Sequence, residues 1–213
     1  MACSCPKPTA LTAITATSCP EEFGQIQRIW LVRKGFVKFD TVDPTTGGTI
    51  PVGLIPNTPD LAAGWTILKA AVDDTKVVMP PLFGGDISIT PGDSITQGGN
   101  DNSTLNGATY ITGKSPSTFS ARYDQLTSTQ TSELNLLECE DLEVYFINEE
   151  GDLIGRRNGD FFQGFDISTY FLGERNVQGI GAFDSNVLTF QLAKDWDQTF
   201  EKVTPSDFNA LTF

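Results

Sequence analysis

The chain of 213 residues contains no histidine. Histidine is the side chain that most often serves as a general base near neutral pH, and it is the commonest metal ligand. The nucleophile-elbow, phosphate-loop and dinucleotide-binding motifs are missing as well. We therefore expect no enzyme activity, no catalytic or cofactor-binding residue and no cofactor. Adjacent acids at Glu21-Glu22, Asp73-Asp74 and Glu149-Glu150 leave a carboxylate-based hydrolase as a remote alternative, because neighbouring side chains on a strand face opposite ways.

The four cysteines do not follow a zinc-site spacing. Cys3 and Cys5 form one tight pair, whereas Cys19 and Cys139 are isolated, and a four-cysteine zinc site normally shows two close pairs. We expect no metal. A zinc knot that ties the N-terminal segment to the rest of the chain is the alternative to free thiols, or to disulfides formed after release from the cell.

Long apolar runs are also missing. No stretch approaches the roughly 18 consecutive apolar residues that span a bilayer, and the N-terminus lacks the basic start and apolar run of a signal peptide. We expect no membrane partner, and synthesis in a reducing cytoplasm before the chain joins a larger assembly.

Basic residues are scarce. The chain has 14 Lys and Arg against 27 Asp and Glu, a net charge of −13, and its sole adjacent arginine pair is Arg156-Arg157. Binding of DNA through phosphate neutralisation needs clustered cations, so this mode is not expected. An acidic surface could instead line a channel from which DNA is repelled. Solubility alone is the other reading of the charge.

Charged residues are few, at 19% of the chain, and residues that favour turns and strands are correspondingly common, including 20 glycines. This composition predicts many short strands. We expect a mostly β fold, a single antiparallel β-sandwich or barrel domain over residues 23–213, with one or two helices and long loops. Residues 1–22 contain two Cys-Pro steps and predict an extended N-terminal arm, either an assembly device or a terminus without fixed structure.

The first helix is predicted near residues 60–74. Pro59 and Asp60 suit a helix start. An apolar stripe at helical spacing supports the helix and is made of Leu61, Trp65, Leu68 and Val72.

The second helix is predicted at residues 127–139. Thr127 can cap its N-terminus with Gln130 three residues later, which is the spacing of a capping box, and Leu126, Leu134 and Leu137 share one face.

Strands are predicted by alternating or continuous apolar runs between turn residues. Residues 142–156 predict a β-hairpin that turns at Glu149-Glu150-Gly151, and residues 161–172 predict one strand with a bulge at its glycine. The polar stretches 43–58 and 91–106 predict long loops, the second as a loop or a hairpin tip, and loops of this length are often contact sites in assemblies.

Three segments resemble virion structural proteins of tailed bacteriophages. They are Cys3-Ser-Cys-Pro-Lys-Pro, the step from Cys19-Pro to Phe23-Gly-Gln-Ile-Gln-Arg, and Tyr145-Phe-Ile-Asn-Glu-Glu-Gly-Asp-Leu-Ile-Gly-Arg. A β domain with a long loop and one well-formed helix is similar in particular to tail-tube proteins.

The resemblance implies a structural role. Tail-tube subunits form hexameric rings in which strands of neighbours close an inner barrel, and the rings stack through the N-terminal arm, a long loop and the C-terminus. The partners would be further copies of the chain and other virion proteins, in the virion, with DNA as non-sticking cargo in an acidic lumen. The alternatives are another virion component, such as a head-decoration, connector or fibre protein, and a β-sandwich ligand-binding module. Loops 43–58 and 91–106 contain no aromatic residue, which counts against a carbohydrate binder.

Overall fold

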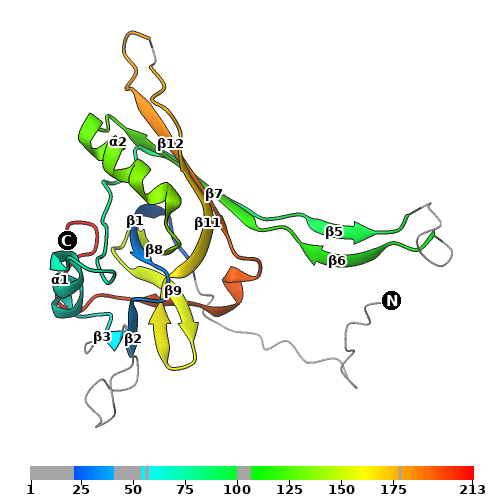
Figure 1. Ribbon diagram of the computed structural model, residues 1–213, viewed down its shortest axis with the longest axis horizontal. Helices are drawn as coiled ribbons and strands as arrows, with labels where there is room; N and C mark the ends of the chain where they lie inside the picture. The colour runs from blue at the N-terminus through cyan, green and yellow to red at the C-terminus, as the bar shows by residue number, and fades with distance from the viewer. Residues whose placement is uncertain (1–21, 41–53, 56–57, 100–106, 178) are drawn as a thin grey trace. The chain divides into compact units, whose positions relative to one another are not determined.

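The computed structural model describes residues 22–40, 54–55, 58–99, 107–177 and 179–213 (Figure 1). The chain divides into two compact units. The larger unit, here called the body, comprises Phe23–Gly92 and Pro116–Phe213. The smaller unit contains Asp93–Ser115, which is inserted within the range predicted to form one β domain, together with Met1–Glu22.

The centre of the body is β8 (Leu142–Asn148), in which all seven residues are buried. One edge of β8 pairs antiparallel with β1 (Ile26–Arg33). The other edge is shared, because β9 (Leu153–Asn158) pairs with its C-terminal half and β11 (Phe165–Leu172) with its N-terminal half. Burial on both faces explains why the sequence of β8 is largely apolar without alternation.

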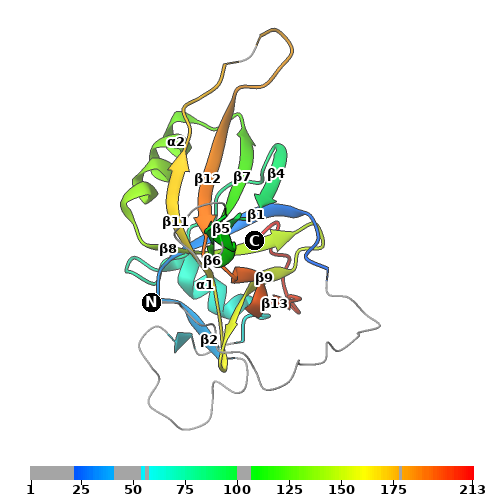
Figure 2. The ribbon, with the colours of Figure 1, turned by 90° about the vertical axis from the view of Figure 1, so that its right-hand side faces the viewer.

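The sheet continues in two directions from this centre. From β11 it passes through β12 (Ser185–Leu192) and β7 (Ser117–Asp124) to β4 (Gly85–Thr90), strands that Figure 2 shows side by side. From β9 it passes to β13 (Phe200–Val203) and to β10 (Phe161–Gln163), β2 (Lys38–Asp40) and β3 (Leu54–Ile55). The path of paired strands ends at β3 and at β4 and does not close on itself in the described residues. The predicted mostly β, sandwich-like fold class is confirmed.

Alternate residues of β8 face two separate apolar cores. Val144 and Phe146 contribute to the first core, which β7 and β12 close from the other side. There Phe119 and Phe190 stack with ring centroids 4.4 Å apart. Offset or edge contacts of this kind add to the apolar area that each ring removes from water.

The second core lies on the opposite face of β8. Tyr145 packs there with Trp30 and Trp65, whose ring centroids are 4.8 Å apart in an edge-to-face arrangement. The buried Trp65 indole donates a hydrogen bond to the carbonyl of Pro59 at 2.8 Å. The C-terminal residues, including Phe208 and Phe213, pack against this core.

Helix α1 spans Ala62–Ala70, which is shorter than the predicted 60–74. Trp65 and Leu68 are buried, as the apolar stripe predicted. Val72 is 98% exposed, so its inclusion in the helix and its stripe was wrong. The reason is local: the backbone is extended at Ala71, and Val72 therefore lies beyond the helix.

Helix α2 spans Ser128–Asn135 and continues as a 3-10 turn, Leu136–Cys139. The capping box is confirmed: the Thr127 hydroxyl accepts from the Gln130 backbone, and the Gln130 side chain accepts from the Thr127 backbone at 2.9 Å. Leu134 is buried in the first core.

The predicted hairpin at residues 142–156 is confirmed by the pairing of β8 and β9, with Gly151 at φ +85° in the turn. The single strand predicted at 161–172 was wrong, because the chain breaks at Gly164 into β10 and β11. A Cβ atom at Gly164 would lie 2.8 Å from the Glu143 Cβ and 3.1 Å from the Val144 nitrogen. The glycine therefore marks a close approach of two backbones rather than a bulge.

The smaller unit contains a two-stranded hairpin, β5 (Ser94–Gln97) and β6 (Tyr110–Lys114). Part of the stretch 91–106 that was predicted as a loop or hairpin tip is thus strand. Several predictions lie outside the described residues: the N-terminal arm apart from Glu22, most of loop 43–58, Glu21, Cys3, Cys5 and Cys19. None of the helices in the described part of the chain is long and apolar enough to cross a membrane.

Candidate functional site

The adjacent acids do not assemble a carboxylate pair among the described residues. Asp73 accepts hydrogen bonds from the backbone and the hydroxyl of Thr75, which lower the pKa of Asp73. Asp74 instead binds the guanidinium of Arg33. Glu150 lies exposed in the turn between β8 and β9 and contacts a lysine. Asp73, Asp74 and Glu150 thus each have a local partner, as expected of solvated or structural carboxylates.

Cys139 is exposed and carries a free thiol at the end of the 3-10 turn. Within the described ranges, no three side chains of His, Cys, Asp or Glu come close enough to hold a metal ion.

A charged cluster lies where β8, β9 and β11 meet. Arg156 on β9 binds Asp166 through two hydrogen bonds of 2.7 and 3.1 Å and contacts the Glu143 carboxylate at 3.2 Å. Glu143 is 1% exposed, and its second carboxylate oxygen has no hydrogen-bond partner. Lys34 lies 3.4 Å from Asp166 at the exposed side of the cluster.

The environment of Glu143 favours its protonated form. Burial raises the pKa of Glu143 to about 7, although Arg156 acts in the opposite direction. A carboxyl group that titrates near neutrality is typical of catalytic acids. Glu143 nevertheless lines neither of the two best-defined cavities of the described structure. We therefore interpret the cluster as structural.

The sequence contained a signal for this cluster that the motif search missed. Glu143 stands inside the continuous apolar run Leu142-Glu-Val-Tyr-Phe-Ile. A charged residue in a strand buried on both faces requires a partner of opposite charge. The choice of Arg156 and Asp166 as its neighbours depends on strand register and was not predictable.

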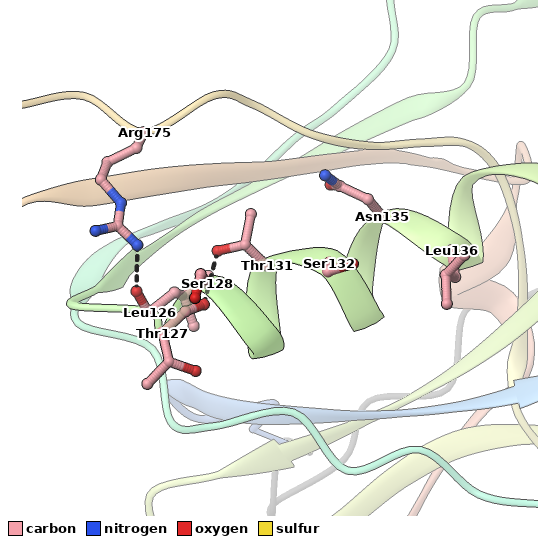
Figure 3. A pocket seen from close by; sticks show the side chains of 8 residues that line it. All are labelled: Leu126, Thr127, Ser128, Thr131, Ser132, Asn135, Leu136 and Arg175. Carbon is pink, nitrogen blue, oxygen red and sulfur yellow. Dashed lines mark hydrogen bonds between the residues drawn. The ribbon is translucent and has the colours of Figure 1, made fainter.

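The larger cavity is an open groove of about 700 Å³ beside α2 (Figure 3). Hydroxyl groups and one guanidinium contribute to its lining. Two of these groups bind backbone carbonyls: the Thr131 hydroxyl donates to Thr127 and the Arg175 guanidinium to Leu126. The capping box already satisfies the start of α2. The lining contains no histidine, cysteine or carboxylate that could serve as a base for a hydroxyl nucleophile. Its lining residues are Leu126, Thr127, Ser128, Thr131, Ser132, Asn135, Leu136 and Arg175.

The second cavity, of about 360 Å³, lies between β1, the segment after α1 and the 3-10 turn that follows α2. Its floor is apolar, with Leu31 and Leu142, and Arg33 spans its rim by binding both Asp74 and Glu140. No residue of this lining has the geometry of an acid–base pair.

The β5–β6 hairpin is the strongest functional candidate. Every residue of β5 is exposed, and in β6 only Gly113 is partly covered. Ile95, Tyr110 and Ile111 are 50%, 56% and 69% exposed. Three large apolar side chains exposed on two short strands, with no core beneath them in the described part of this unit, are unusual for a solvated element.

A bulge interrupts the register of the hairpin. Ile95 lies opposite Gly113, and a Cβ atom at that glycine would touch the Ile95 side chain at 3.9 Å. The next pair is Thr96 with Ile111, so the register shifts by one residue and Thr112 is the extra residue. Ile111 therefore lies on the face opposite to Ile95, and both faces of the hairpin expose a large apolar side chain.

No family model matches the chain, and no curated protein matches it. The functional argument therefore depends on the residues and the geometry described above.

Proposed function

We propose that the chain is a structural virion subunit that assembles with copies of itself into rings stacked as the tail tube of a bacteriophage. The single observation that carries the proposal is the hairpin, which exposes Ile95, Tyr110 and Ile111 and has no apolar core among the described residues of its unit. A two-stranded hairpin alone is marginally stable in water and gains stability when its exposed apolar side chains are covered. In the proposed assembly a neighbouring subunit supplies that cover.

An open sheet edge adds support. In the described residues β4 pairs with β7 on one side only, and it ends the path of strands. Unpaired edge strands are a hazard for a protein that stays monomeric, whereas neighbouring subunits in a ring satisfy them.

The charge fits a conduit for DNA. A net charge of −13 disfavours adhesion of a polyanion through phosphate contacts. In this proposal the protein is not an enzyme and needs no cofactor, and its partners are further copies of itself and other virion proteins.

Negative-stain electron microscopy combined with solution mass tests the proposal. We expect rings or tubes with a central channel, and a mass that is a multiple of 23.1 kDa. A strict monomer at high protein concentration would reject self-assembly and would favour a head-decoration protein or a ligand-binding module.

A further inference from the structure

Glu143 and Asp166 are two acids that face each other across neighbouring strands. In the antiparallel register of β8 and β11 they occupy directly opposite positions, so their side chains lie on the same face of the sheet. Like charges at such positions repel each other. The arrangement therefore favours a state in which the two carboxyl groups together carry one negative charge rather than two.

One arginine serves both acids, and its bonds to them are unequal. Arg156 binds Asp166 at 2.7 and 3.1 Å, whereas its contact with Glu143 is 3.2 Å long and uses the Nη2 atom that also binds Asp166. With its amide oxygen toward Arg156, Gln163 accepts from Nε at 3.1 Å and from Nη2 at 3.0 Å. The guanidinium is thus engaged mainly by Asp166 and Gln163, and its compensation of Glu143 is partial.

The turn between β1 and β2 supplies the other polar neighbours of Glu143. The Gly35 backbone donates to the Glu143 Oε1 at 3.3 Å, and the half-exposed Lys34 lies 3.4 Å from Asp166. Tyr145, two residues along the same face of β8, stays uncharged because burial raises its pKa well above the ordinary value. None of these groups reaches the second carboxylate oxygen of Glu143, which is buried without a hydrogen-bond partner.

Ionisation of Glu143 is therefore costly in the closed structure. A buried carboxylate oxygen that loses water and gains no donor destabilises the charged form. The pKa of Glu143, which burial raises to about 7, agrees with this argument from the contacts. Opening of the surrounding structure would return water to the carboxylate and remove the cost.

The strand pairing at the two acids is short. β8 and β11 pair through Phe165 with Val144 and through Asp166 with Glu143, directly after the close backbone approach at Gly164. In the path of paired strands, β11 links β8 to β12, β7 and β4. By contrast, β7 and β12 pair along their whole length. A short pairing opens at a lower free energy than a long one, so the start of β11 is the segment expected to open first.

We propose that Glu143 and Asp166 form a proton-dependent latch between β8 and β11. While the two acids carry one negative charge, the start of β11 stays paired with β8. When both are ionised, this pairing opens locally and admits water to the Glu143 carboxylate. The latch does not depend on the proposed self-assembly, because every residue that forms it belongs to the body of one copy.

Hydrogen exchange of the wild-type protein at pH 5 and pH 7.5 tests the latch. Peptides that cover residues 161–168 are compared with peptides from β7 and β12, and every rate is corrected for the pH dependence of chemical exchange. We expect opening at 161–168 to increase about tenfold or more, because Glu143 in the opened segment titrates near its ordinary value of 4.5. The β7 and β12 peptides should change by less than about twofold.

Two results would overturn the latch. An equal increase in the β7 and β12 peptides would show that Glu143 ionises through global unfolding, and no increase at 161–168 would show that the pairing does not respond to protons. The wild-type comparison needs no substitution, so it holds even where a variant fails to fold.

Substitution of Glu143 identifies the group that titrates. Glu143→Gln keeps the shape of the side chain without its charge, and the corrected exchange at 161–168 should then be the same at both pH values. Glu133→Gln, at an exposed position of α2, is the control and should show the wild-type increase. A Glu143→Gln variant that keeps the wild-type increase would assign the response to another group and reject the latch.

Asp166→Asn tests whether the second acid belongs to the latch. The substitution removes the repulsion and leaves Arg156 to bind Glu143, so the increase at 161–168 should fall to about threefold or less. An increase as large as in the wild type would show that Glu143 acts without Asp166, which contradicts the paired arrangement.

Discussion

Glu143 and Gly164 show how single residues determine the junction of β8 and β11. The two lie against each other: a side chain at position 164 would strike the Glu143 Cβ and the backbone of Val144. Close approach of the strands buries the Glu143 carboxylate, and Arg156 compensates only part of the cost. The charged form of Glu143 therefore opposes folding.

We predict that Glu143→Gln reduces the dependence of stability on pH. In the unfolded chain Glu143 loses its proton near pH 4.5, whereas in the folded protein it keeps the proton up to about pH 7. The folded state thus binds more protons between these values, and stability falls as the pH rises through this window, by about 3 kcal/mol from this group. Urea unfolding at pH 5 and pH 7.5 should show a smaller difference for the variant than for the wild type.

The exposed Glu133, replaced by glutamine, is the control and should keep the wild-type pH dependence. An unchanged slope in Glu143→Gln would show that the carboxyl group of Glu143 does not titrate differently in the folded protein.

We predict that Gly164→Ala destabilises the body by about 1–3 kcal/mol, because the added methyl group meets backbone and Cβ atoms that cannot rotate away. Gly179→Ala adds the same group where no atom lies within 4 Å and should change stability by less than about 0.5 kcal/mol. Chemical denaturation of both variants checks the difference. Equal stabilities would mean that β8 and β11 separate without cost.

The roles of individual residues could be predicted only in part from the sequence. The absence of histidine led to the expectation that the chain is not an enzyme, which stays a prediction. The cluster of Glu143, Arg156 and Asp166 could not be predicted, because its members are joined by strand pairing and not by spacing along the chain.

At the scale of elements, α2 is defined by its N-terminal cap. The hydroxyl of Thr127 accepts from the Gln130 backbone at 3.2 Å, and the helix exposes most of its other residues. With Leu134 as its only buried residue, α2 has little tertiary packing to replace the cap.

We predict that Thr127→Ala lowers the stability of the protein by about 1 kcal/mol, as loss of an N-cap typically does. Ser128→Ala, at the exposed first helical residue, should be near neutral. Thermal unfolding of the two variants distinguishes them, and the same melting temperature for both would show that the cap does not stabilise the helix.

Elements with strong local signals were predicted best. The capping box set the start of α2, and Gly151 set the turn between β8 and β9. Helix α1 was predicted too long, because the apolar spacing in the sequence continues to Val72. The helix ends at Ala70, and Val72 is exposed. The break at Gly164 was missed because a glycine at a strand crossing and a glycine in a bulge look alike in sequence.

At the scale of the whole molecule, burial on both faces of β8 creates two cores, and the mostly β class followed from composition. The pairing order of the strands did not follow, because it is fixed by contacts between residues far apart in the chain. Outside these cores, the β5–β6 hairpin and the β11–β12 pair with its connection expose large apolar side chains. We propose that assembly covers them.

The mass of the protein in solution over a series of concentrations, measured for the wild type, Ile111→Asp and Thr112→Asp, tests self-assembly through the hairpin most directly. The two variants add the same charge at adjacent exposed positions of one strand, one apolar and one polar in the wild type. Our account predicts that the wild type and Thr112→Asp grow to multiples of 23.1 kDa, while Ile111→Asp stays near the mass of one chain. A wild type that remains a monomer at the highest concentration, or an Ile111→Asp variant that assembles as the wild type does, would contradict it.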